Sequence, residues 1–282
     1  MPQIDQYAVF GHPISHSKSP RIHGLFAKQT SQTLNYVARD VPADAFESNA
    51  GTFFAAGGKG LNCTVPLKEL AWRYADTLTE RARLSKAVNT LARQPDGRIL
   101  GDNTDGMGLV NDLMTNNRIG LSGYRILILG AGGATRGILP PILEHHPGDI
   151  TIANRTPAKA ETIAYEFSHL GKLISSDFPG LAGRQFDLII NATSASLSDQ
   201  LPPLPEKLLA ANGSCYDLAY ANEPTAFVRW GLQQGARLSL DGLGMLVEQA
   251  AEAFYLWRGI RPETSPVIKL LDGERGESSV PA

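Results

Sequence analysis

The sequence predicts an α/β protein of two domains, and three observations lead to this prediction. Short β-like runs alternate with helical stretches along most of the 282 residues, and such alternation is typical of α/β folds. An apolar run at 124–129 passes directly into the glycine-rich segment GAGGATRG and then into a helical stretch, as in the first unit of a doubly wound sheet. The length suits two domains of ordinary size, each with its own core.

The first domain is predicted from an alternation of strand-like and helix-like segments. Strands are expected at Tyr7–Phe10, Leu34–Val41, Gly60–Val65, Ala87–Leu91 and Arg98–Leu100. Helices are expected at Pro20–Gln29 and Leu67–Tyr74, each opened by a proline where no backbone donor is lost.

The second domain begins near residue 120 and is predicted as a Rossmann-like, doubly wound sheet. Strands are expected at Tyr124–Leu129, Ile150–Ala153, Asp187–Asn191, Ser214–Leu218 and Arg237–Leu240. Helices are expected from the glycine segment to Glu144 and at Pro157–Leu170. This succession of βαβ units is the pattern of a doubly wound fold.

The C-terminal part is predicted to be helical. Met245–Arg258 has an apolar face, Glu263–Leu271 forms a second helical stretch, and the polar tail ERGESSVPA is expected to be disordered. We place the first domain at 1–104 and the second at 105–244, and expect the C-terminal helices at about 245–275 to return to the first domain.

Composition and charge exclude several classes of protein. Hydrophobic residues make up 43% and charged residues 19%, and the net charge is −2, so nothing points to disorder, nucleic acid or an anionic membrane. Two distant cysteines, Cys63 and Cys215, form no disulfide or metal-ligand pattern. The N-terminus has no leader-like pattern, and no apolar run reaches membrane-spanning length. We expect a soluble, cytoplasmic protein without a metal site.

The glycine segment predicts a nucleotide site. Gly130, Gly132 and Gly133 follow a buried strand and precede a helix, which lets the backbone approach a pyrophosphate at a helix N-terminus. Thr135 occupies the third glycine position of the strict motif. The alternative is a tight strand–helix turn without a ligand.

The end of the next strand favours NADP over NAD. An NAD site usually has an acidic residue there to hold the ribose 2′-hydroxyl. Here Asn154, Arg155 and Thr156 follow the strand, with Lys159 one turn further on, and these groups suit a 2′-phosphate. The alternative is a solvated arginine beside a helix capped by Thr156.

Lys68 and Asp105 are candidates for acid–base chemistry. Lys68 falls in the first turn of a helix expected to begin at Pro66, where the helix dipole disfavours a cation and eases loss of its proton. Asp105 lies in GDNTDG between the domains. The alternatives are a surface lysine and an aspartate that favours a helix N-terminus.

Other polar residues stand where packing alone does not require them. Ser17 and Ser19 precede the first helix, where one serine suffices as a cap. Asn89 interrupts an apolar strand, and Gln249 lies on an apolar helix face. Buried amides need hydrogen-bond partners, and these are either a polar ligand or backbone and water.

Taken together, these segments resemble the shikimate dehydrogenase family. The resemblance extends from Phe10 to about Trp257 and is carried by GHPISHSKSP, NCTVPLK, AVNTL, GDNTDG, LGAGGATRG, ANRT, NATS and DGLGMLVEQAA, in family order and spacing. It implies NADPH-dependent reduction of 3-dehydroshikimate to shikimate, as a monomer or homodimer. The first domain would then bind the substrate and the second NADP(H).

The resemblance also implies roles for individual residues. Lys68 and Asp105 would form the catalytic pair. Shikimate would be bound by Ser17, Ser19, Thr64, Lys68, Asn89, Asp105, Tyr220 and Gln249. NADP(H) would be bound by Gly130, Ala131, Gly132, Gly133, Ala134, Asn154, Arg155, Thr156, Lys159, Thr193, Ser194, Leu218 and Gly242. Glu80 matches a cofactor-linked family position by resemblance alone.

Three departures and three rival functions accompany this interpretation. Cys63 replaces an apolar residue and is expected to be buried, His12 replaces an asparagine, and Ala195-Ser196-Leu197 replaces a glycine-containing turn.

The rivals are a relative preferring quinate or NAD, a methylene-tetrahydrofolate dehydrogenase, and a non-catalytic sensor of shikimate-like ligands. A methylene-tetrahydrofolate dehydrogenase would not need the paired serines together with the amides. A non-catalytic sensor would not need an intact Lys68 and Asp105.

Overall fold

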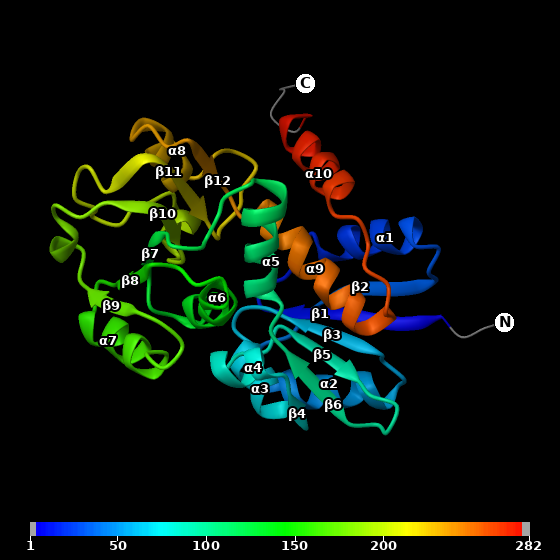
Figure 1. The fold of residues 1–282 in the computed structure, drawn as a ribbon. Coiled ribbons are helices and arrows are strands. Elements are labelled where there is room, and N and C mark those ends of the chain that lie inside the picture. Colours follow the sequence, from blue (N-terminus) through cyan, green and yellow to red (C-terminus); the bar gives the residue numbers. More distant parts are fainter. Residues whose placement is uncertain (1–3, 278–282) are drawn as a thin grey trace. The chain divides into compact units, whose positions relative to one another are not determined.

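The computed structural model describes residues 4–277, which divide into two compact units. Residues up to Gly108 group with Val247–Val267, and Leu109–Leu246 groups with the residues from Ile268 on. Both units are α/β, as the sequence predicts (Figure 1). No helix within residues 4–277 is long and apolar enough to cross a membrane.

The first unit contains a six-stranded mixed sheet in the order β2-β1-β3-β5-β6-β4. Its strands are β1 (Asp5–Gly11), β2 (Leu34–Asp40), β3 (Gly60–Cys63), β4 (Thr77–Leu78), β5 (Thr90–Arg93) and β6 (Ile99–Asp102). Strands β2, β1 and β3 are parallel, and β5 runs antiparallel to both β3 and β6. The loops after β1 and β3 therefore leave the sheet at the same edge.

The helices of the first unit are α1 (Ser19–Gln29), α2 (Phe46–Ala55), α3 (Lys68–Tyr74), α4 (Glu80–Ser85), the start of α5 (Asp105–Asn111) and most of α9 (Leu243–Arg258), with a short 3₁₀ turn at Ala43–Ala45. One core cluster centres on Phe10, Phe53 and Leu61. Aromatic rings from α1, β2 and α9 pack together around His23, which stacks on Tyr36 with 4.2 Å between ring centroids.

The second unit contains a parallel sheet in the order β12-β11-β10-β7-β8-β9. Its strands are β7 (Arg125–Leu129), β8 (Asp149–Ala153), β9 (Leu173–Ser176), β10 (Phe186–Asn191), β11 (Leu209–Asp217) and β12 (Leu238–Leu240). Counted from β7, this is the Rossmann strand order, which reverses between β7 and β10. Ligands of such sheets bind outside the carboxyl ends of the strands at that point.

The helices of the second unit are α6 (Gly133–Leu143), α7 (Pro157–Glu166), α8 (Ala226–Gln233) and most of α10 (Ser265–Glu277), with a π-helical turn at Asp112–Asn116 after α5 and 3₁₀ turns at Pro179–Leu181 and Ala195–Ser198. The strand β7 is buried from Ile126 to Leu129. It passes directly into the glycine segment and α6, as its apolar run predicts.

Two sequence expectations are corrected. Asn89 lies just before β5, which begins at Thr90, and not inside a strand. The last helix reaches Glu277, so a disordered tail from Glu274 is wrong for 274–277, while 278–282 lie outside the described residues. Residues from Ile268 group with the second unit, because Arg275 pairs with Asp241 and donates to the carbonyl of Ala221 there. Most of α9 and the first residues of α10 group with the first unit.

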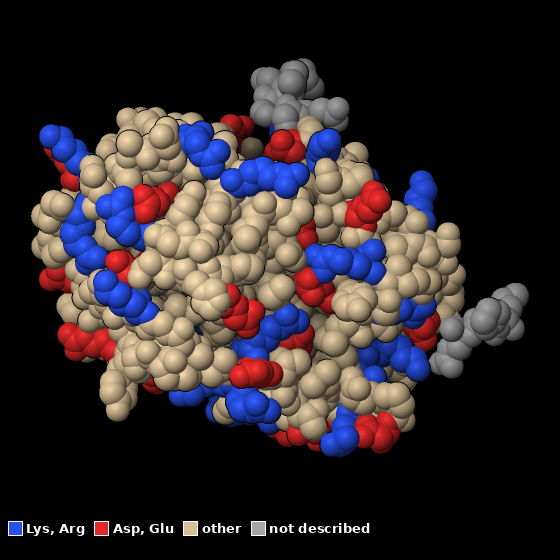
Figure 2. All heavy atoms as spheres, viewed as in Figure 1, with Lys and Arg blue, Asp and Glu red and all other residues tan. Residues whose placement is uncertain are grey.

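Charged residues of both signs are interspersed on the molecular face shown in Figure 2. This distribution agrees with the net charge of −2. It offers no broad basic surface, on the face shown, of the kind that binds nucleic acid.

Candidate active site

A pocket of about 650 Å³ lies in the second unit at the carboxyl ends of β7, β8 and β10. It is lined by Gly130, Ala131, Gly132, Gly133, Ala134, Asn154, Arg155, Thr156, Lys159, Phe178, Ala192, Thr193, Ser194, Ala195, Ser198, Gln200, Leu201, Pro202 and Pro203. Its position is the point where the strand order reverses, which is where doubly wound sheets bind dinucleotides.

The glycine segment forms one wall of this pocket. Gly130 has φ +104°, and a Cβ there would lie 3.0 Å from the carbonyl oxygen of Ala192, so the position favours glycine. Apart from the adjacent residues and the backbone of α6 itself, a Cβ at Gly132 or Gly133 would meet no atom of the described residues within 4 Å. These two glycines therefore keep clear a space next to the N-terminus of α6, as a bound pyrophosphate requires.

Thr135 explains how the loop forms without the third glycine of the motif. Its side chain is buried, and its hydroxyl donates a 2.8 Å hydrogen bond to the carbonyl oxygen of Gly130. This bond ties the first turn of α6 to the end of β7. Threonine in place of the third glycine therefore stabilises the loop by this hydrogen bond and does not fill the pocket.

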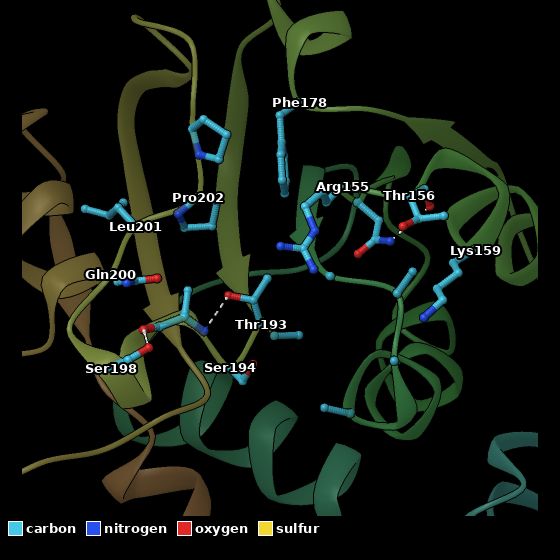
Figure 3. Close-up of a pocket in the computed structure, with 18 of the residues that line it drawn as sticks. Arg155, Thr156, Lys159, Phe178, Thr193, Ser194, Ser198, Gln200, Leu201 and Pro202 are labelled. Carbon is cyan, nitrogen blue, oxygen red and sulfur yellow. Dashed lines mark hydrogen bonds between the residues drawn. The ribbon is translucent and has the colours of Figure 1, made fainter.

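A group of basic and polar residues forms the opposite wall, at the end of β8. The side chain of Arg155 extends into the pocket, with Thr156 and Lys159 beside it (Figure 3). Within residues 4–277, no carboxylate pairs with either cation. Thr156 stands at the N-cap of α7, yet its hydroxyl makes no capping bond. The interpretation of Thr156 as a simple cap is therefore wrong.

The loop after β10 forms a third side of the pocket. Thr193 donates both its backbone N–H and its hydroxyl to Oδ1 of Asn191, at 3.1 and 2.7 Å. Thr193 and Ser194 are among the residues that line the pocket. Leu218, Gly242 and Glu80 are not among its lining residues. Leu218 and Gly242 nevertheless lie against each other, since a Cβ at Gly242 would be 2.3 Å from the oxygen of Leu218.

In the first unit, Lys68 and Asp105 form an ion pair. Nζ of Lys68 lies 2.5 Å from Oδ2 of Asp105, and their side chains are 30% and 13% exposed. Lys68 is the first residue of α3, and Asp105 is the first residue of α5. The two helix starts bring together residues 37 positions apart. Both side chains are thus partly shielded from solvent, and both remain accessible to a ligand.

Asn89 holds the other oxygen of that carboxylate. Its Nδ2 donates to Oδ1 of Asp105 at 2.8 Å and to the hydroxyl of Thr104 at 2.9 Å. Its Oδ1 accepts from the N–H of Thr104 and the hydroxyl of Thr90, both at 2.9 Å. Gln249, on α9, lies 3.4 Å from the same amide nitrogen through its Oε1. The partners of the buried amide are thus largely protein groups.

The serine and threonine candidates lie on neighbouring loops of the first unit. The N–H of His12 donates to the carbonyl of Val65, and a Cβ at Gly11 would lie 2.5 Å from Cγ2 of Thr64. The helix α1 begins at Ser19, whose N–H donates to Oγ of Ser17 at 3.3 Å. Ser17 thus lies in the loop after β1, next to the loop of Thr64, and Ser19 is the first residue of α1.

Three further residues that the sequence singles out are Tyr220, Cys63 and His12. Tyr220 belongs to the second unit, after β11, and burial raises the pKa of its phenol. Cys63 is buried as expected, and burial raises the pKa of its thiol. His12 is exposed, with Nδ1 at 2.5 Å from Oδ1 of Asp40. No group of three or more His, Cys, Asp or Glu residues within 4–277 is arranged to hold a metal ion.

Sequence reasoning did not single out Asp217. It is fully buried at the end of β11 and accepts hydrogen bonds from Asn191, Ser196 and Thr225. Its local sequence, CYDLAY, gives no sign of this role. The only signal available was the row of polar residues in NATSAS, which lies at the end of the neighbouring strand.

A Rossmann-ordered sheet with a glycine loop and unpaired cations, joined to a unit that carries a lysine–aspartate pair, defines an oxidoreductase that uses a nicotinamide dinucleotide. Three family models match the chain. They are described as "Shikimate dehydrogenase substrate binding domain" at residues 9–91, "Shikimate / quinate 5-dehydrogenase" at 112–198, and "Shikimate 5'-dehydrogenase C-terminal domain" at 242–271.

Individual relatives agree with the family models. The chain is 63% identical to the shikimate dehydrogenase (NADP(+)) of Methylococcus capsulatus over 98% of this chain and 99% of that protein. The crystal structure of an Ael1 enzyme from Pseudomonas putida superposes with a TM-score of 0.89 at 48% identity, covering 95% of this chain and 98% of that one. The chain belongs to the shikimate dehydrogenase family.

A structure with both ligands bound is also similar. Shikimate 5-dehydrogenase from Thermus thermophilus, solved in complex with NADP(H) and shikimate, superposes with a TM-score of 0.84 at 32% identity. The match covers 98% of this chain and 100% of that one.

Proposed function

We propose that this protein catalyses the reversible reduction of 3-dehydroshikimate to shikimate with NADPH, in the pathway to chorismate and the aromatic amino acids. The observation that carries the proposal is the pair formed by Lys68 and Asp105, with 2.5 Å between Nζ and Oδ2. It accompanies a pocket shaped for a dinucleotide and stands in a chain whose relatives are named shikimate dehydrogenases.

The residues of the second unit fit NADP(H). Gly130 to Ala134 would hold the pyrophosphate at the N-terminus of α6, where Gly132 and Gly133 leave open space. Arg155 and Lys159, with Asn154 and Thr156, would hold the 2′-phosphate by charge-assisted hydrogen bonds. NADPH supplies a hydride to the carbonyl carbon of the substrate when it is bound.

The nicotinamide half would meet the remaining candidates of the second unit. Thr193 and Ser194 line the same pocket on the β10 side. We assign Leu218 and Gly242, which contact each other at the ends of β11 and β12, to the nicotinamide end. Glu80 is kept as a cofactor-linked residue on family resemblance alone.

Lys68 would give the proton. Its Nζ has three N–H donors, of which one reaches Asp105, so the others are directed to a substrate oxygen. A cationic amine at that oxygen stabilises the charge that develops there and then transfers a proton to it. Asp105 orients Lys68 through Oδ2 and accepts a hydrogen bond from a neighbouring substrate hydroxyl.

The remaining substrate residues would fix the ring. Ser17 and Thr64 lie on the adjacent loops after β1 and β3, Ser19 is the first residue of α1, and their hydroxyls would suit a carboxylate. Asn89 lies beside Asp105, Gln249 lies beside Asn89, and both amides would serve the ring hydroxyls. Tyr220 is assigned to the substrate by family resemblance. Anchoring both ends of the substrate selects the face that receives hydride.

A substrate and cofactor panel tests this function. Purified protein is mixed with shikimate or quinate and with NADP or NAD, and the near-ultraviolet absorbance of the reduced nicotinamide is followed. We expect fast reduction with shikimate and NADP alone. Equal rates with quinate or NAD would assign the protein to relatives of broader specificity. Shikimate binding measured by calorimetry, without turnover in any combination, would overturn the proposal in favour of a sensor.

We further propose that the protein acts in the cytoplasm as a monomer or homodimer. Both cysteines are free and buried, which suits a reducing compartment. Light scattering of the purified protein at several concentrations measures the oligomeric state.

A further inference from the structure

Asp217 is a buried carboxylate at the carboxyl end of β11. Its side chain is 0% exposed, and no cation among the described residues lies within ion-pair distance. Four hydrogen bonds surround it instead. Oδ2 accepts from the hydroxyls of Ser196 and Thr225, each at 2.6 Å, and Oδ1 accepts from Nδ2 of Asn191 and the N–H of Ala219, each at 3.1 Å.

The neighbouring hydrogen bonds show that the hydroxyls of Thr225 and Ser196 are the donors to Asp217. The hydroxyl of Thr225 accepts from the N–H of Val228 at 3.2 Å, and the hydroxyl of Ser196 accepts from Nδ2 of Asn191 at 3.0 Å. Each hydroxyl proton is therefore free to point at Asp217. Both oxygens of Asp217 accept two bonds, which is the capacity of an ionised carboxylate. Burial raises the pKa of Asp217, and these bonds oppose that rise.

The carboxylate determines how Asn191 is oriented. Because an anion accepts only, the NH₂ group of Asn191 must face Asp217 and its oxygen must face away. That oxygen receives the N–H and the hydroxyl of Thr193. With its hydroxyl used in this way, Thr193 places Cγ2 next to Gly130, where an added Cβ would lie 3.2 Å from it. The chain of contacts thus leads from Asp217 to the pocket wall.

The same carboxylate holds two further segments at this edge of the sheet. Its bond from Ala219 turns the backbone after β11, where Leu218 lies against Gly242. Its bond from Thr225 engages the N-cap of α8. Ser196, in the turn that departs from the glycine-containing family pattern, adds the donor from the loop side.

We propose that Asp217 is a positioning residue for the dinucleotide pocket, which through Asn191, Ser196 and Thr225 keeps the loop 192–196 in the conformation that receives NADP(H). The identity of the dinucleotide rests on the proposed function. The preformed state of the loop does not, since it is a property of the ligand-free chain. Asp217 itself does not line the pocket and acts only through its partners.

Variants of Thr225 test the proposal, because Thr225 is remote from the pocket lining. Thr225→Ala removes one donor to Asp217 together with the cap of α8, and Thr225→Ser keeps both. Ser239→Ala is the matched control: Ser239 donates to the carbonyl of Val228 on the same helix at 2.8 Å and makes no bond to Asp217. Ser196→Ala removes the loop-side donor and serves if Thr225→Ala does not fold.

Two readouts are taken at a temperature well below unfolding. Hydrogen exchange of the Thr193 and Ala195 amides is measured in the ligand-free protein, and the Kd of NADPH is measured by calorimetry. Loss of a hydrogen bond to a charged group should speed exchange and weaken NADPH binding by about tenfold in Thr225→Ala and Ser196→Ala. Thr225→Ser and Ser239→Ala should keep both values.

The proposal is overturned if Thr225→Ala and Ser196→Ala lose stability while amide exchange and the Kd of NADPH stay unchanged. It is also overturned if Ser239→Ala weakens NADPH binding as much as Thr225→Ala does, since the effect would then follow α8 packing. Absence of shikimate turnover in the wild type would instead contradict the proposed function, and the two readouts would still decide the role of Asp217.

Discussion

Asn89 and Asp105 are joined by a 2.8 Å hydrogen bond from Nδ2 of the amide to Oδ1 of the carboxylate. With Lys68 on Oδ2, both oxygens of Asp105 are held in place. The two protons of the amide and the two acceptor positions of its oxygen already have protein partners. Asn89 is therefore placed to orient Asp105, and it binds a substrate hydroxyl only if the ligand displaces one of these partners.

Replacing Asn89 with alanine distinguishes these two roles. The change leaves Oδ1 of Asp105 and the N–H of Thr104 without their partner, so we expect kcat to fall by about tenfold with a smaller rise in the KM for shikimate. Steady-state kinetics measures both values. A rise in the KM for shikimate with unchanged kcat would contradict orientation and assign Asn89 to substrate binding.

Arg155 should decide the preference for NADPH. Arg155→Asp removes an unpaired guanidinium from the pocket and adds a negative charge, so the KM for NADPH should rise by at least about tenfold. The KM for NADH should change little, since that cofactor lacks the 2′-phosphate. Equal effects on the two cofactors would contradict the assignment of the 2′-phosphate site.

The glycine loop permits a matched pair of substitutions. Gly133→Ala adds a methyl group where no protein atom lies within 4 Å, so stability should change by less than about 0.5 kcal/mol while NADPH binding weakens. Gly130→Ala forces alanine into φ +104° and should also cost about 1–3 kcal/mol of stability. Thermal unfolding and calorimetry measure the two effects. Unimpaired NADPH binding by Gly133→Ala would show that the open space is not the pyrophosphate site.

His23 should make the first unit sensitive to acid. Its ring is 1% exposed, neither ring nitrogen has a hydrogen-bond partner within residues 4–277, and burial, opposed by the nearby Asn62 side chain, lowers its pKa to about 3. Because the pKa in the unfolded chain is higher, the unfolded state binds more protons as the pH falls below about 6.5. Stability should therefore decrease with falling pH, by about 2 kcal/mol at pH 5 relative to neutral pH.

The substitution His23→Phe removes the proton site and keeps an aromatic ring stacked on Tyr36. Urea unfolding at pH 7 and pH 5 compares the two proteins. The variant should lose less stability than the wild type over this range. The same loss in both proteins would show that other groups cause the acid sensitivity.

The sequence predicts the second unit best, because its signals are local. The glycine segment with the apolar run before it and the basic residues after Ala153 are each contained in one short segment, and the structure places the glycines and the basic residues on the walls of one pocket. Three helices were missed, namely Phe46–Ala55, Glu80–Ser85 and Ala226–Gln233. Phe46–Ala55 contains asparagine, glycine and threonine, which lower helix propensity. Ala226–Gln233 was not predicted, although Thr225 before it is a residue type that favours the N-cap and does cap this helix.

Features that depend on distant contacts could not be predicted in the same way. The hydrogen-bond partners of Asp217 come from positions 191, 196, 219 and 225 on different elements. No local sequence pattern predicts these contacts. The distance between Lys68 and Asp105 likewise depends on how α3 and α5 begin. The sequence singles out both residues as catalytic candidates, and only the fold shows that their side chains meet.

The most direct test of the proposed catalysis is the kcat for shikimate oxidation by Lys68→Ala, with Lys28→Ala, an exposed lysine at the end of α1, as the control. Loss of the proton-transferring group should reduce kcat by about two to four orders of magnitude, with little change in the KM for shikimate. The control should keep wild-type kcat. A kcat for Lys68→Ala close to that of the wild type would contradict the role of Lys68.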